Sequence, residues 1–142
     1  MAILKTLEDV KIDMENDIKY LFSLDLDTVG KLLDDPILKE GLFKRAAIYN
    51  NLAMDAPQPL PKMFILIYMF NYTQKQVANE LGISQSYVSR LHKKLLLYFV
   101  DKINEMEENN SYICDKSIMN NLLSAVYYKD APGLDPGLEW NK

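Results

Sequence analysis

The sequence predicts an all-α protein built around a helix-turn-helix, in which two helices are joined by a short turn. Apolar residues recur at three- and four-residue steps along most of the chain, which is the period of amphipathic helices. A helix-start signal at Thr73 and a turn glycine at Gly82 mark the two consecutive helices. Prolines at positions 57, 59 and 61 divide the chain into an N-terminal and a C-terminal part.

The N-terminal segment, residues 1–54, is expected to be helical. Its first helix carries an apolar stripe made of Ile3, Leu7, Val10, Met14, Ile18 and Leu21. Because about three heptads are few for a coiled coil, we favour packing of this stripe on its own chain, with a homodimer seam as the alternative. A second helix is predicted from about Asp27 to Leu33. Asp35-Pro36 starts a third, which runs to about Leu52 with Leu38, Leu42, Phe43, Ala46 and Ala47 inside.

Three further segments follow the N-terminal one. Residues 55–61 are a proline-rich linker, residues 62–106 a helix-turn-helix module, and residues 107–142 a C-terminal helix and tail. In the module, Lys62 to Asn71 is predicted to be a buried helix, and the last helix extends to Met106, so its extra apolar surface should pack on the N-terminal helices or on a partner. The C-terminal helix is expected from Ser117 to Tyr128. Trp140 in the tail either anchors a partner or folds back on the domain.

Residues 72 to 84 carry the signals of a helix start and a tight turn. The Thr73 hydroxyl and the Gln76 amide have the spacing of a capping box, and Tyr72 and Val77 have that of a hydrophobic staple. Gly82 can adopt the left-handed conformation that ends a helix. A second helix is therefore expected to begin at Ser84.

The second helix separates its side chains into two faces at about 100° per residue. Ser84, Val88, Leu91 and Leu95 fall on the inner face. The predicted base contacts on the outer face are Gln85, Ser86, Ser89 and Arg90, and the predicted DNA backbone contacts are Thr73, Lys75, His92, Lys93 and Lys94. Gln can pair with adenine, Arg with guanine and Ser with either, while lysines hold phosphates. An ordinary solvated helical hairpin is the alternative, but the cap, staple, turn glycine and acid-free face occur together.

Residues 73 to 95 resemble region 4.2 of bacterial sigma-70-type sigma factors, particularly those of sporulation, and residues 60 to 70 resemble region 4.1. The resemblance implies that Gln85, Ser86, Ser89 and Arg90 read a −35 promoter element in the major groove. It also implies contact with the β flap of RNA polymerase. His92 stands where the sporulation pattern has Glu and can add a positive charge below its ordinary pKa of about 6.5, so we expect the preferred bases to differ from the family's. No segment before residue 60 resembles sigma region 2, and a second protein is a candidate supplier of that function.

Composition sets limits on the class of protein. The formal charge is −4, but residues 73 to 102 hold five bases against two acids, which leaves −7 elsewhere. We therefore expect modest DNA affinity without a partner. The lone Cys114, the lack of a secretory signal and the lack of a long apolar run predict a cytoplasmic protein that does not contact membranes. With His92 as the only histidine, we expect no metal site, no cofactor and no enzymatic activity.

Three functions fit these residues. The first is a sigma-like transcription factor that reads DNA and contacts RNA polymerase. The second is a self-contained dimeric helix-turn-helix repressor or activator that reads a palindrome. The third is a protein that occupies the polymerase flap and displaces a sigma factor while hardly touching DNA. The base-capable outer face favours the first over the third.

Overall fold

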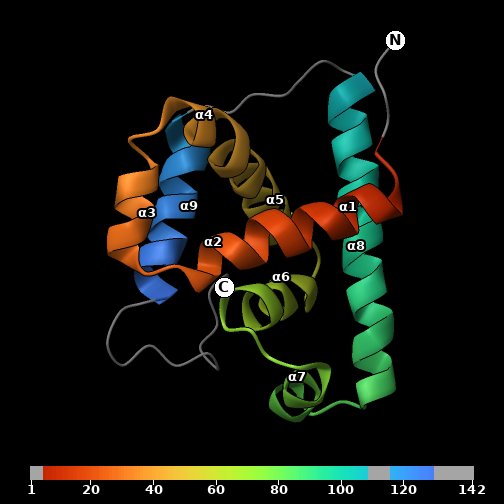
Figure 1. Cartoon of the computed structure of the whole chain (residues 1–142). Coiled ribbons are helices and arrows are strands. Elements are labelled where there is room, and N and C mark those ends of the chain that lie inside the picture. Colours follow the sequence, from red (N-terminus) through yellow and green to blue (C-terminus); the bar gives the residue numbers. More distant parts are fainter. Residues whose placement is uncertain (1–4, 109–115, 130–142) are drawn as a thin grey trace.

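The computed structural model describes residues 5–108 and 116–129, and this part of the chain contains helices and no strand (Figure 1). The all-α prediction is therefore confirmed. In Figure 1 a long helix, α8, stands along one side of the molecule, and α1 crosses it. The turn between α7 and α8 lies at the lower end of this view, away from α3 and α4.

The first helix is continuous and consists of α1 (Leu7–Asp13), the π-helical segment η1 (Met14–Ile18) and α2 (Lys19–Ser23). It begins at Thr6, whose hydroxyl accepts the N–H of Asp9 in a capping box. Four members of the predicted apolar stripe are fully buried: Val10, Met14, Ile18 and Leu21. The expectation that the stripe packs on its own chain is thus confirmed for these four residues, and Ile3 lies outside the described residues.

Short helices then lead to a long one. They are α3 (Leu26–Leu32), α4 (Pro36–Leu38), the π-helical η2 (Lys39–Phe43) and α5 (Lys44–Asp55). The Asp35 carboxylate accepts the Ile37 N–H at 2.9 Å, and Pro36 occupies the first turn, as the sequence predicted. Leu42, Phe43, Ala46 and Ala47 are buried and Leu38 is half-buried.

The last described helix, α9 (Lys116–Lys129), packs against α5 and buries Leu122 and Val126. Its bounds differ by one residue at each end from the predicted ones. Cys114 and Trp140 lie outside the described residues, and so does the predicted tail.

The connection between α5 and α6 is shorter than the predicted linker of residues 55–61. Helix α5 ends at Asp55, and α6 (Leu60–Phe64) already begins at Leu60, with Pro61 in its first turn, where a proline costs no hydrogen bond. Helix α6 continues as the π-helical η3 (Ile65–Met69), then α7 (Gln74–Leu81) and α8 (Gln85–Glu108) follow. The predicted buried helix of residues 62 to 71 therefore starts two residues early and ends at Met69.

One hydrophobic core joins the two parts of the chain. The ring of Phe99 on α8 meets Tyr49 of α5 edge-on at 5.2 Å and Phe64 of α6 at 6.2 Å between centroids. Nearer the C-terminal end of α8, the Lys5 backbone exchanges two hydrogen bonds with the Asn104 side chain, at 2.7 and 3.0 Å. The C-terminal half of α8 is thus fixed to the N-terminal helices. This packing is one of the two that its extra apolar surface predicted.

Polar bonds add to this attachment. Tyr49 Oη donates to Asp13 Oδ2 at 2.5 Å. Arg45, whose side chain is half-exposed, donates from Nε to Asp17 Oδ2 at 2.6 Å. Both carboxylates lie on the N-terminal helix, so these bonds orient it against α5. None of the described helices combines the length and apolar character that a bilayer crossing requires.

Candidate nucleic-acid interface

Helix α7 begins with the predicted capping box. The Gln76 N–H donates to Thr73 Oγ1 at 3.2 Å, and the Thr73 N–H donates to Gln76 Oε1 at 2.8 Å. Val77 is fully buried and Tyr72 is half-buried, as a hydrophobic staple requires. Because two free backbone donors are satisfied at this end, the start of α7 is well defined.

The turn after α7 depends on one glycine. Gly82 has φ 69° and ψ 35°, the left-handed conformation that most residues avoid. The chain then doubles back, and the Ile83 N–H donates to the Ala78 carbonyl at 3.0 Å. Ser84 is the cap of α8, with its Oγ accepting the Tyr87 N–H at 3.1 Å, so the helix starts at Gln85, one residue later than expected.

The first three turns of α8 have the two faces that the sequence predicted. Val88, Leu91 and Leu95 are buried against the core. The four predicted base contacts, Gln85, Ser86, Ser89 and Arg90, are all exposed. Ser84, which was placed on the inner face, is exposed because its side chain caps the helix end.

Arg90 is the only strongly charged group among the four predicted base contacts. Its guanidinium carbon lies 5.4 Å from the centroid of the Tyr87 ring, a cation–π distance. Tyr87 is itself 43% exposed, so the pair stands in solvent beside Ser86. The aromatic ring restricts the arginine without neutralising it, which leaves the guanidinium donors available to an acceptor.

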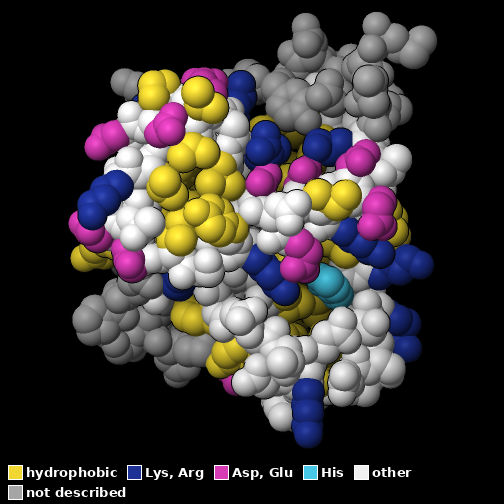
Figure 2. Space-filling view, in the orientation of Figure 1, with side chains coloured by type: hydrophobic (Ala, Val, Ile, Leu, Met, Phe, Trp, Pro, Cys, Tyr) yellow, Lys and Arg dark blue, Asp and Glu magenta, His cyan; other side chains and the backbone are white. Residues whose placement is uncertain are grey.

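The predicted backbone contacts lie around this face. Thr73, Lys75, Lys93 and Lys94 are exposed, and the Thr73 hydroxyl keeps its capping role. In the space-filling view, Lys and Arg side chains project along the side where α8 stands, and the histidine lies at the edge of a hollow (Figure 2). Lys93 and Lys94 follow the predicted base contacts within the next turn of α8.

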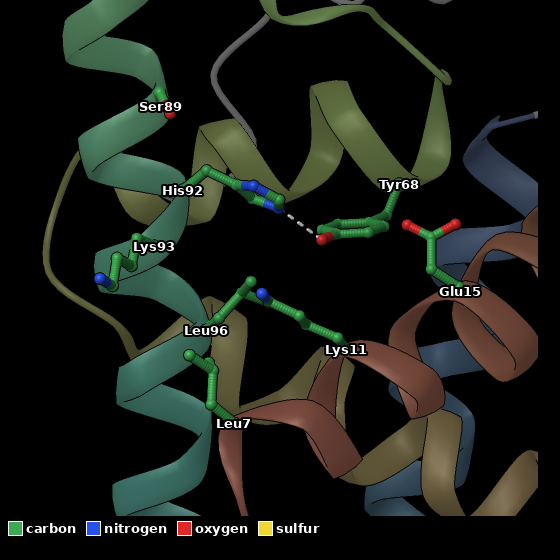
Figure 3. A pocket seen from close by; sticks show the side chains of 8 residues that line it. All are labelled: Leu7, Lys11, Glu15, Tyr68, Ser89, His92, Lys93 and Leu96. Carbon is green, nitrogen blue, oxygen red and sulfur yellow. Dashed lines mark hydrogen bonds between the residues drawn. The ribbon is translucent and has the colours of Figure 1, made fainter.

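His92 is less free than the sequence indicated. It is half-buried, and its Nε2 lies 2.6 Å from Oη of Tyr68 on η3 (Figure 3). Burial lowers the pKa of His92, as do the nearby positive charges of Lys19 and Lys11, whereas Glu15 raises it. Burial also raises the pKa of Tyr68. At neutral pH the imidazole is therefore uncharged, and a positive charge on His92 appears only at lower pH.

Sequence reasoning missed the residues that approach the interface from outside the helix-turn-helix. Leu7, Lys11 and Glu15 of the N-terminal helix and Tyr68 of η3 line a cavity together with Ser89, His92, Lys93 and Leu96. No local pattern could have identified them, because the contacts depend on how the first helix crosses α8. Among the described residues, no group of histidine, cysteine or acidic side chains is placed to hold a metal ion.

Comparison with protein families identifies the segment that carries this geometry. Residues 62–97 match the family model of sigma-70, region 4, which covers about a quarter of the chain. The match includes η3, α7 and the first half of α8, the elements that form and support the exposed face. Neither the search of curated proteins nor that of solved structures found a match.

Proposed function

Because residues 62–97 form a sigma-70 region 4 module, we propose that the protein is a sequence-specific transcription factor that reads a −35-type promoter element. Region 4 is a DNA-binding regulatory module and not an enzyme family. In this proposal α8 enters the major groove, where Arg90 and Gln85 pair with base edges and Ser86 and Ser89 make shorter contacts. Such a protein acts in the cytoplasm.

The exposed face of α8 is the observation that carries this proposal. Gln85, Ser86, Ser89 and Arg90 are exposed together on the helix that follows Gly82, and Val88 and Leu91 fix its opposite side to the core. A groove reader needs that combination of a rigid support and a polar, acid-free surface. Thr73, Lys75, Lys93 and Lys94 are assigned to phosphates, as is His92 through Nδ1, since Nε2 is bonded to Tyr68.

Contact with RNA polymerase is the second part of the proposal. The net charge of −4 opposes the phosphate backbone, so the module alone should bind DNA modestly. Attachment to the β flap would hold it at the promoter, and a second protein would supply the function of sigma region 2. The burial of Val10, Met14, Ile18 and Leu21 favours this proposal over a dimeric repressor that would use the same stripe.

Two experiments test this function. In the first, the protein is titrated into fluorescent −35-type and random duplexes at several salt concentrations; we expect modest, salt-dependent binding with preference for the promoter sequence. In the second, the protein is tested for pull-down of RNA polymerase and for promoter-dependent transcription. Capture of polymerase with no DNA preference and no transcription would instead identify a protein that displaces a sigma factor. Tight, salt-insensitive DNA binding with no capture would favour a self-contained regulator.

A further inference from the structure

An open cavity of about 480 Å³ lies between the N-terminal helix and α8, beside the predicted reading face. Its floor includes the Tyr68–His92 hydrogen bond, and Lys11 of α1 extends toward α8 across it (Figure 3). Two lining residues, Ser89 and Lys93, also belong to the predicted DNA-contacting set. The cavity is therefore continuous with the proposed DNA interface.

The cavity offers positive charge that the described residues do not neutralise. Neither Lys11 nor Lys93 forms an ion pair with the described part of the chain. The acid of the cavity, Glu15, is already paired with Lys19 at 3.5 Å. The Lys11 ammonium and the His92 imidazole thus face this space, and the Lys93 side chain leaves α8 on the side away from Lys11 (Figure 3).

We propose that this cavity binds a backbone phosphate of the DNA whose bases α8 reads, with Lys11 as a contact supplied from outside the region 4 module. The inference rests on the proposed function and adds a residue of the N-terminal helices to the DNA interface. Lys11 approaches the phosphate from α1, and Ser89 of α8 connects this contact to the neighbouring base contacts.

The backbone position of Lys11 is fixed in the protein without DNA. Helix α1 is attached to α8 by the two hydrogen bonds between Lys5 and Asn104, and the buried Val10 and Met14 hold its inner face. A phosphate therefore meets a lysine whose backbone needs no rearrangement, which lowers the entropic cost of the contact. In this proposal the N-terminal helices cover the apolar half of α8 and also place the Lys11 ammonium where it can contact the DNA backbone.

The test is a titration of the full-length Lys11→Gln variant into promoter and random duplexes over a range of salt. Loss of one phosphate contact should weaken both duplexes alike, roughly 3- to 10-fold near 0.1 M salt, and lower the slope of log K against log salt by about 0.9. Lys39→Gln is the matched control, because Lys39 is an exposed lysine on η2, which adjoins α4 far from the α7–α8 turn (Figure 1). Unfolding midpoints of the two variants should equal that of the wild type.

The outcomes separate this inference from the function on which it rests. If the wild type prefers promoter DNA but Lys11→Gln keeps its affinity and salt slope, the phosphate site is wrong and the function stands. If both lysine variants weaken binding equally, the effect is one of overall charge and the site is again wrong. If the wild type binds no duplex, the proposed function fails and the phosphate site fails with it.

Discussion

The two halves of α8 follow the same helical period but differ in what covers them. From Gln85 to Lys94 the helix buries only a narrow stripe, and its outer face is polar and exposed. From Leu95 to Met106 it is packed by α1, α5 and α6, with Phe99 fully buried among aromatic rings. One continuous helix thus presents an exposed polar face at its N-terminal end and is part of the core at its C-terminal end.

This difference explains why the reading end can be both exposed and rigid. A short exposed helix is marginal in water, because its stability comes mainly from tertiary packing. Here the packed half holds the exposed half in place through a shared backbone. The N-terminal helices therefore stabilise the interface without covering its outer face.

The largest expected effect comes from the packed half. Phe99→Ala removes a ring that contacts Tyr49 and Phe64, and should lower the free energy of unfolding by about 3–5 kcal/mol. Leu97→Ala is the control, since Leu97 is 46% exposed on the same helix and should change it by less than about 1 kcal/mol. Urea unfolding followed by circular dichroism measures both. Equal losses for the two variants would mean that this half is not a core element.

Substitutions in the exposed half of α8 should change the free energy of DNA binding rather than the free energy of unfolding. Arg90→Ala is expected to cost about 1–3 kcal/mol of binding free energy on the preferred site and to relax one base position. Lys93→Ala should weaken all sequences alike, because a phosphate contact carries no base information. Binding of each variant to a panel of single-base-substituted duplexes checks this. An Arg90→Ala loss that is the same on specific and random DNA would contradict the base-contact assignment.

The turn that starts the exposed half depends on Gly82. Gly82→Ala should cost about 1–2 kcal/mol of stability, because φ 69° is strained for a residue with a Cβ although no atom obstructs the added methyl. Gly30→Ala on α3 also meets no neighbour and has ordinary helical backbone, so it should stabilise by about 0.5–1 kcal/mol. Thermal unfolding compares them. We expect Gly82→Ala to lower the stability and Gly30→Ala to raise it. A change in the same direction for both variants would refute the role of Gly82 in the turn.

The smallest expected effect concerns the Tyr68–His92 bond beneath the interface. Because the pKa of His92 is lowered by folding, the unfolded chain takes up a proton near its ordinary pKa of about 6.5 while the folded chain resists. The stability that His92 contributes is therefore present above pH 6.5 and falls as the pH drops below it. His92→Gln should remove this loss, so the stability of the wild type relative to the variant should decrease between pH 7.5 and 5.5. A relative stability that increases on acidification would show a raised pKa instead.

The same contrast explains what the sequence could predict. The capping box at Thr73, the left-handed Gly82 and the buried stripe of α1 depend on nearest neighbours or helical period, and all were predicted correctly. The cavity and the partner of His92 depend on how two distant helices cross, which no local pattern contains. The base and phosphate assignments remain predictions, and so does the domain boundary at residues 55–61. Tyr49 and Phe64, on either side of that segment, belong to one hydrophobic core.

The most direct test of the account places a photo-cross-linking amino acid at position 86, on the exposed face of α8, and irradiates the protein with promoter duplex. Ile37 on α4, which is 81% exposed and far from the α7–α8 turn in Figure 1, is the control position. We predict that position 86 becomes covalently attached to DNA bases and that position 37 does not. Attachment of position 86 only to protein, or equal attachment at both positions, would contradict the claim that this face enters the groove.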